Sequence, residues 1–151
     1  MNSIAHAKRI PYILNNCRTI AVVGLSPKPH RASFDVSRYM QAAGYRIIPI
    51  NPNATQVLGE KAYATLQEAA QHETIELVNC FRNSEDIPPI VDAAIAIGAK
   101  AVWMQLGVSN AAAAARAEAA DLLVVQNHCI KIDHRVLMSS GLLQPPDAPL
   151  R

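Results

Sequence analysis

Hydrophobic positions along the chain form short runs that alternate with longer amphipathic stretches. The runs are rich in Val and Ile, and most are apolar throughout, which is typical of parallel strands covered by helices on both faces. Five runs are predicted as strands: Thr19 to Val23, Arg46 to Ile50, Glu76 to Cys80, Ala101 to Met104 and Leu122 to Val125. Strands separated in this way by helical segments indicate βαβ units.

Residues that favour helix ends lie between these runs. Ser33 is predicted to cap the first crossover helix, and Thr65 with Glu68 has the spacing of a capping box. Asn110 is predicted to cap an alanine-rich helix, and Gly98 to end the helix before it. A helix is therefore expected in each connection between strands.

Short crossovers between five parallel strands predict an α/β fold, a Rossmann-like doubly wound five-stranded parallel sheet in a single domain. We expect a leading helix within residues 1–18, the sheet domain over 19–137 and a C-terminal tail over 138–151. The expected strand order is 3-2-1-4-5. Ligands would then bind at the carboxyl ends of the strands, beside the switch point between the first and fourth strands.

Composition narrows the function classes. The 151 residues carry 14 Lys and Arg against 12 Asp and Glu, with no basic block to follow a nucleic-acid backbone. No apolar run approaches the ~20 residues of a membrane span. Three cysteines, far apart in the chain and without a Cys-x-x-Cys motif, indicate reduced thiols and no metal site. We expect a cytoplasmic protein that binds a small molecule, without nucleic acid or membrane.

The segment after the first strand has the chemistry of a phosphate site. Gly24 opens a turn that leads into a helix, whose first N–H groups and partial positive charge favour an anion. Ser26, Lys28 and Arg31 add donors in the same loop. A plain connecting loop with solvated charges is the alternative interpretation.

The sequence argues against ordinary NAD binding. Only Gly24 remains of the three glycines in the dinucleotide motif, and Ser26 stands at the second position. The second strand ends in Asn51, Pro52 and Asn53, where an NAD enzyme carries an acid for the ribose. Pro52 could lie against an adenine ring or simply form a turn.

Several strings along the chain carry a family resemblance. They are Ile20 to Ser26, Ile48 to Pro52, Phe81 to Ser84, Ala96 to Lys100 and Trp103 to Val108. In this order they resemble the small stand-alone bacterial CoA-binding proteins over about Thr19 to Ile132. More distantly, the chain is similar to the CoA-binding half of the succinyl-CoA synthetase alpha subunit. The resemblance implies a Rossmann-like domain that binds coenzyme A.

The resemblance also implies roles for the matching residues. The Gly24 loop would hold the pyrophosphate, Pro52 would flank the adenine, and Phe81 with Arg82 would border the pantetheine or adenosine. The string Gln105-Leu106-Gly107 would line the pantetheine arm. Together with the loop residues above, the candidate cofactor-binding residues are Gly24, Leu25, Ser26, Lys28, Arg31, Ser33, Asn51, Pro52, Phe81, Arg82, Asn83, Gln105, Leu106, Gly107 and Cys129.

One position departs from the family pattern. Relatives commonly carry a lysine just beyond the proline after the second strand, suited to the 3′-phosphate, and this chain has Asn53 to Gln56 there. Arg46, Lys61 and Arg31 are the possible substitutes.

No constellation in the sequence predicts catalysis. Cys129 follows His128 at the end of the last strand, where a thiolate could exchange with CoA disulfide, but a half-buried thiol beside a solvent-facing histidine is the alternative. Arg82 could bind a ligand or pair with Glu85 or Asp86. We expect a non-catalytic CoA-binding protein. The alternatives are an NAD(P)-linked oxidoreductase, a ligase-type subunit or a nucleotide-sensing regulatory module.

Overall fold

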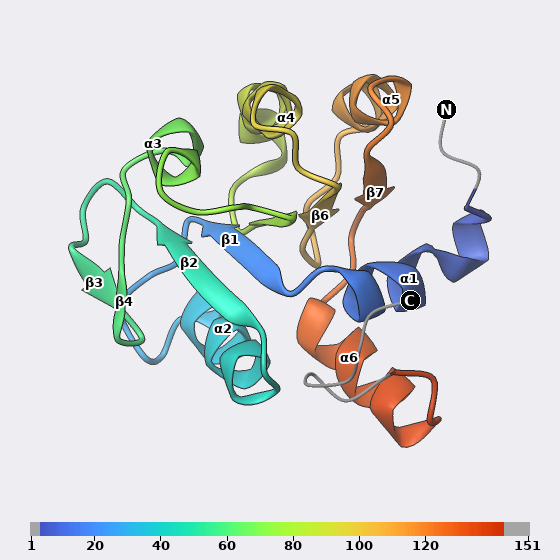
Figure 1. The fold of residues 1–151 in the computed structure, drawn as a ribbon, viewed down its shortest axis with the longest axis horizontal. Helices are drawn as coiled ribbons and strands as arrows, with labels where there is room; N and C mark the ends of the chain where they lie inside the picture. Colours follow the sequence, from blue (N-terminus) through green and yellow to red (C-terminus); the bar gives the residue numbers. More distant parts are fainter. Residues whose placement is uncertain (1–3, 144–151) are drawn as a thin grey trace.

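A computed structural model of the chain describes residues 4–143, and the last residues of the expected tail, 144–151, lie outside the described residues. Its centre is a five-stranded parallel sheet in the order β2-β1-β5-β6-β7 (Figure 1). These strands are β1 (Thr19–Val23), β2 (Arg46–Ile50), β5 (Leu77–Cys80), β6 (Ala101–Met104) and β7 (Leu123–Val125). All five lie within a residue of the predicted runs, so the doubly wound α/β prediction is confirmed.

The predicted strand order is wrong. β5, the third strand of the sheet along the chain, pairs with β1 instead of β2, which gives the order 2-1-3-4-5. After β2 the chain forms a small antiparallel hairpin of β3 (Gln56–Val57) and β4 (Glu60–Lys61). Tyr63 then bonds to the outer edge of β2, with its N–H donating to the Pro49 carbonyl oxygen at 3.0 Å. Because Tyr63 occupies the outer edge of β2, β5 pairs with the other side of β1. The switch point therefore lies between β1 and β5.

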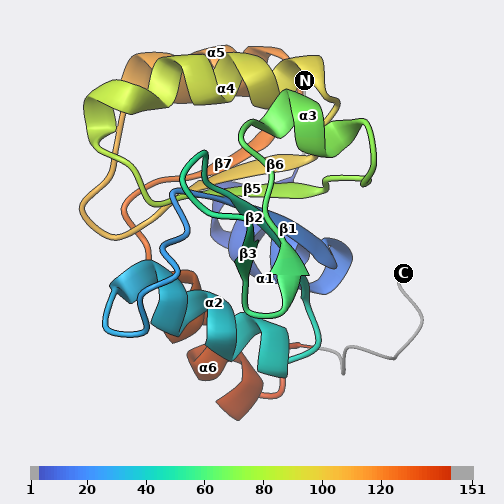
Figure 2. The same ribbon diagram turned by 90° about the vertical axis from the view of Figure 1, so that its left-hand side faces the viewer.

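Helices cover both faces of the sheet (Figures 1 and 2). One face carries α1 (Arg9–Asn16), α2 (Ala32–Ala42) and α6 (Ile130–Ser139), and the other carries α3 (Leu66–Ala70), α4 (Ile87–Ala96) and α5 (Ala111–Ala119). Short 3-10 turns, His6–Lys8 and Ser84–Asp86, precede α1 and α4. Alternate strand residues enter the two cores: Ile20 and Val22 pack toward α1 and α2, and Ala21 packs toward the α3 to α5 layer.

The helix ends test the capping predictions. Thr65 and Asn110 are confirmed as caps, with side chains that accept from the N–H groups of Glu68 and Ala113. Ser33 is not the cap of α2, because the helix begins at Ala32 and Arg31 takes the N-cap position. The Ser33 hydroxyl instead accepts from the Ser26 N–H at 3.0 Å, so it fastens the loop to the helix.

The β3–β4 hairpin and α6 were not predicted from the sequence. α6 extends to Ser139 and therefore includes the first two residues of the expected tail. Buried His134 joins α6 to α2, since its Nδ1 lies 2.9 Å from the Tyr39 hydroxyl. The Lys131 ammonium pairs with the Asp35 carboxylate at 2.8 Å on the same helix pair.

Gly24 lies where the loops after β1 and β5 meet. Its φ of +88° is unfavourable for residues with a side chain, and a Cβ there would overlap the Phe81 carbonyl oxygen. Its N–H donates to the Ile50 carbonyl oxygen at 3.0 Å, which continues the pairing of β1 with β2. A glycine is therefore needed for three strand ends to come together.

We predict that Gly24→Ala lowers the free energy of unfolding more than Gly98→Ala does. Gly98 is a matched control, because its φ is +76° and a Cβ there would meet nothing within 4 Å. Both variants carry the backbone penalty of about 1–2 kcal/mol, and only Gly24→Ala must also displace the loop after β5. Urea unfolding of both variants measures the difference, and equal losses would contradict the proposed close approach.

We also predict that His134 makes the fold sensitive to mild acid. Burial lowers the pKa of His134, so protonation is easier in the unfolded chain. The free energy of unfolding should therefore be unaffected above the unfolded pKa near 6.5 and fall as the pH drops below it, by up to about 1.4 kcal/mol per pH unit.

Urea unfolding at pH 7.5, 6.5 and 5.5 tests this dependence. His134→Gln keeps an acceptor for Tyr39 and should flatten the pH dependence, and the matched substitution of exposed His30 should not. An unchanged slope in His134→Gln would refute the assignment to His134.

Candidate functional site

Three adjoining cavities run along the carboxyl edge of the sheet, the side on which the strands give way to the loops. In Figure 2 these loops lie between the two helix layers, with α4 above and α2 and α6 below. The first and second cavities share Gly24 and Ser26, and the second and third share Ala32 and Phe81. Arg82 lines both the first and the third. The cavities therefore form one continuous groove that bends around Gly24.

The first cavity, of about 500 Å³, lies between the ends of β1 and β2 and the first turn of α4. Its walls combine apolar surfaces with amides and one pair of opposite charges. They consist of Val23, Gly24, Ser26, Ile50, Asn51, Pro52, Asn53, Ala64, Arg82, Asp86, Pro89 and Ile90. Such a mixture suits a flat heteroaromatic ring with polar edges.

Asn51 holds two walls of the first cavity in place. Its side-chain Nδ2 donates to the Leu25 carbonyl oxygen at 2.9 Å, and its Oδ1 accepts from the Asn53 N–H at 2.8 Å. The amide thus ties the loop after β2 to the loop after β1. It sets the distance between Pro52 and the Gly24 turn.

The second cavity, of about 360 Å³, lies over the N-terminus of α2. Lys28 and Arg31 contribute cations, and no carboxylate of the described residues forms an ion pair with either. The loop is held by its own serines, because the Lys28 N–H donates to the Ser26 hydroxyl at 3.1 Å. Positive charge and helix N–H groups make this cavity attractive to an anion.

The third cavity, of about 450 Å³, lies between the loops after β5 and β6 and the first turns of α2 and α6. Its walls are mainly apolar: Ala32, Val36, Phe81, Arg82, Asn83, Gln105, Leu106, Val108, Cys129 and Ile132. Gln105 also supports α6, because its Oε1 accepts from the Ile130 N–H at 3.1 Å. A flexible, largely apolar chain fits these walls better than a charged group does.

The structure brings together all but two of the candidate residues. Leu25 is fully buried in the core and offers the site only its carbonyl oxygen, through Asn51. Gly107 lines none of the three cavities, and its N–H donates to the Asn127 side chain at 2.7 Å in a turn. The remaining candidates, from Gly24 to Cys129, line the groove.

Several lining residues were not identified from the sequence. Asp86, Pro89 and Ile90 reach the first cavity because the switch point brings α4 beside β1, and Val36 and Ile132 reach the third from helix interiors. The wrong strand order concealed the first group. The amphipathic pattern of residues 130–139 was the available signal for Ile132.

The charged and reactive groups of the groove have definite partners. Arg82 lies 3.7 Å from the Asp86 carboxylate, so the ion pair considered as an alternative is present at the groove itself. His128 pairs with Asp133 at 2.8 Å and lines none of the three cavities, although Cys129 lines the third. Among the described residues, no group of three or more His, Cys, Asp and Glu side chains could hold a metal ion.

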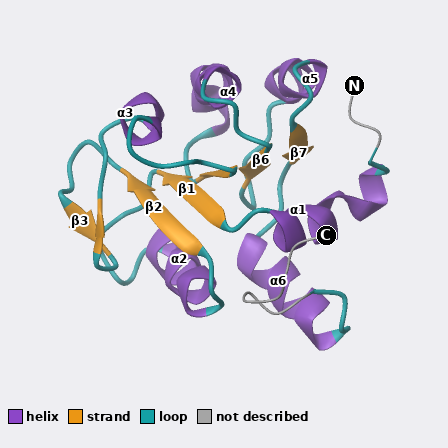
Figure 3. Cartoon of the chain, viewed as in Figure 1, coloured by secondary structure: helices purple, strands orange, loops and turns teal. Residues whose placement is uncertain are grey.

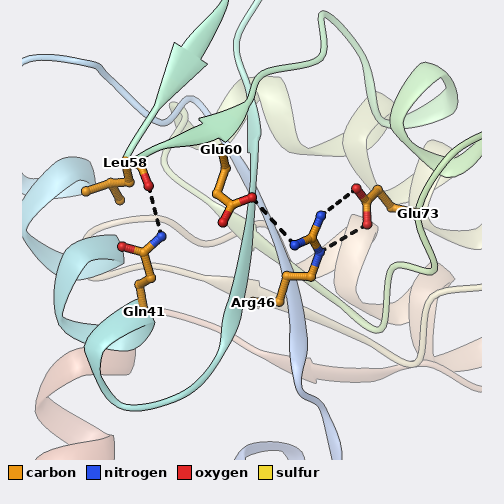
Figure 4. Close-up of polar contacts among 5 residues, drawn as sticks. All are labelled: Gln41, Arg46, Leu58, Glu60 and Glu73. Atoms are coloured by element: carbon orange, nitrogen blue, oxygen red, sulfur yellow. Dashed lines mark hydrogen bonds and ion pairs between the residues drawn. The ribbon is translucent and has the colours of Figure 1, made fainter.

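Two of the proposed substitutes for the missing lysine lie elsewhere. Arg46 begins β2, at the opposite edge of the sheet, and its guanidinium is held by Glu73 at 2.7 Å and Glu60 at 3.5 Å (Figure 4). The Lys61 Nζ lies 5.2 Å from the centre of the Tyr63 ring and lines none of the cavities. Only Arg31 of the three reaches the groove.

Helices of the described chain are short, as Figure 3 shows, and none of them is long and apolar enough to cross a membrane.

Comparison with known proteins shows the family to which the chain belongs. The sequence pattern of the CoA binding domain family matches residues 18–135. The uncharacterized protein YneT of Bacillus subtilis is 40% identical over 127 residues, which cover 84% of this chain and 93% of YneT. A hypothetical protein from Pyrococcus horikoshii OT3 superposes with a TM-score of 0.83 at 34% identity, covering 90% of this chain and 94% of that one. A Thermus thermophilus structure, cell-free ID.343, has a TM-score of 0.80 at 27% identity, covering 89% and 99%. The chain belongs to the CoA binding domain family.

Proposed function

We propose that the protein binds coenzyme A along the whole groove, with the adenosine in the first cavity, the pyrophosphate in the second and the pantetheine arm in the third. The observation that carries this proposal is the order of the three cavities. A cavity with mixed apolar and amide walls, a cationic cavity and a mainly apolar cavity adjoin one another as the parts of coenzyme A do.

The second cavity is the anchor of this arrangement. Lys28 and Arg31 offer charge that no carboxylate of the described residues neutralises, and the N-terminus of α2 adds its dipole. A pyrophosphate is the group of coenzyme A that uses both. Gly24 holds the loop after β5 against this cavity, because a side chain at this position would overlap the Phe81 carbonyl oxygen.

The first and third cavities then determine the direction of the ligand. Pro52 and the α4 residues Pro89 and Ile90 give an adenine two apolar surfaces. Leu106 and Ile132 offer exposed apolar side chains at the other end, where the pantetheine arm would lie. The thiol of the ligand would then come near Cys129.

We assign no reaction to the groove. The histidines lack the geometry of an acid-base site, since His128 is paired with Asp133 away from the groove and His134 is buried between helices. An NAD(P)-linked oxidoreductase is the weaker alternative, because Asn51 stands where a ribose-binding acid is needed. A nucleotide-sensing module would bind the same ligand and differ only in having a protein partner.

The first test is binding itself. Coenzyme A at 100 times its Kd should raise the free energy of unfolding by about 2.7 kcal/mol. Lys28→Ala and Arg31→Ala should each weaken binding about 10-fold or more, because each removes a charged donor from the pyrophosphate. Arg38→Ala is the matched control, since Arg38 is an exposed α2 residue paired with Asp35 outside the groove.

Thermal unfolding and calorimetric titration with coenzyme A, NAD, NADP and ATP would measure these effects. Stabilisation by NAD without any by coenzyme A would overturn the proposal. Equal losses of affinity for coenzyme A in Arg38→Ala and Lys28→Ala would show that the pyrophosphate does not bind in the second cavity.

The second test concerns the direction of the ligand. If the pantetheine thiol lies near Cys129, incubation with CoA disulfide should give a mixed disulfide at that residue. The Cys129 thiol would lose its proton to water, and the resulting thiolate would attack one sulfur of the disulfide. One molecule of coenzyme A would leave as a thiolate and take a proton from water. Cys17 and Cys80 should not react, because burial raises the pKa of each thiol to about 12.

Intact-protein mass spectrometry detects the adduct and its loss on reduction. Cys129→Ser should abolish the adduct, and prior saturation with a non-thiol analogue of coenzyme A should slow it in the wild type. An adduct that persists in Cys129→Ser would place the thiol end elsewhere.

A further inference from the structure

We infer that Asp86 is a specificity residue that prevents the site from favouring the 3′-phosphate of coenzyme A, so that dephospho-CoA binds at least as tightly as coenzyme A. The ligand class is then the adenosine-diphosphate pantetheine compounds, with or without the 3′-phosphate. This inference rests on the proposed function, because it assumes that the adenosine occupies the first cavity.

The charges of the first cavity carry the inference. Among its lining residues only Arg82 and Asp86 are charged, and their side chains lie 3.7 Å apart. The pair contributes no net charge to the cavity. A 3′-phosphate that entered would have to compete with the Asp86 carboxylate for the only cation on these walls.

Asp86 is fixed in this position by the backbone. Its N–H donates to the Asn83 carbonyl oxygen at 2.9 Å, which closes the 3-10 turn, and it is the N-cap residue of α4. Its side chain makes no capping bond to the helix. The helix therefore does not hold the carboxylate, which lines the first cavity beside Arg82.

The other cations near the site are committed elsewhere or too distant. Lys28 and Arg31 line the second cavity, where the pyrophosphate would engage them. Arg46 begins a strand whose other end lines the cavity, about 13 Å away at the usual strand rise, and it is held by two glutamates (Figure 4). Among the described residues of β2 and its loop, no lysine or arginine lines the first cavity.

The two ribose substituents would meet Asp86 differently. A free 3′-hydroxyl can donate a hydrogen bond to a carboxylate, whereas a phosphate dianion can only accept and is repelled by it. Removing the negative charge should therefore improve binding of the phosphorylated ligand alone, partly because Arg82 loses its competing partner.

Calorimetric titration of the full chain with coenzyme A and with dephospho-CoA tests the inference. In the wild type, the Kd for coenzyme A should equal or exceed that for dephospho-CoA. Asp86→Asn should tighten coenzyme A about fivefold, while dephospho-CoA changes less than twofold because the amide oxygen still accepts. Asp92→Asn is the matched control, since Asp92 is an α4 acid paired with Arg116 that lines none of the cavities.

The outcomes separate the two claims. Coenzyme A binding more tightly than dephospho-CoA in the wild type, by more than the error of the titration, would overturn the inference and leave the proposed function standing. Failure of both ligands to bind would overturn the proposed function. Equal changes in the Kd of both ligands in Asp86→Asn would show that Asp86 does not determine specificity. Asp86→Ser replaces Asp86→Asn in this test if the first variant unfolds.

Discussion

The close approach of two loops at Gly24 is the constraint on which the site depends. The loop after β1 must pass the backbone of Phe81 without a side chain between them, and the positive φ of Gly24 makes this possible. The same residue continues the hydrogen bonding from β1 to β2 through Ile50. The loops after β1, β2 and β5 can therefore form the walls of a single groove.

The rest of the fold keeps this edge of the sheet available for binding. Two separate apolar cores, one on each face, bury the strands, and few residues of the loops at the carboxyl edge, such as Leu25, take part in them. At the amino ends of the strands, ion pairs join neighbouring segments. Glu76 pairs with Lys100 at 2.9 Å, and Arg46 pairs with Glu73 (Figure 4).

Within the groove, position decides which charges act on a ligand. Lys28 and Arg31 have no acidic partner among the described residues and lie over a helix N-terminus. Arg82, a candidate for ligand binding because it follows β5, is instead paired with the Asp86 carboxylate. A neutral first cavity beside a positive second one concentrates the positive potential of the groove over the N-terminus of α2, where we propose that the pyrophosphate binds.

The sequence by itself determined the five strands of the parallel sheet, the caps of α3 and α5 and about half of the residues that line the groove. Continuous apolar runs and caps such as Thr65 are local signals, and the residues after parallel strands meet at one edge whatever the strand order. The side of β1 on which β5 pairs was decided only by the tertiary structure, because Tyr63 occupies the edge of β2 through backbone bonds that leave no pattern in the sequence. That choice brought Asp86 to the groove, since long-range pairing, not chain position, decides which charges share a cavity.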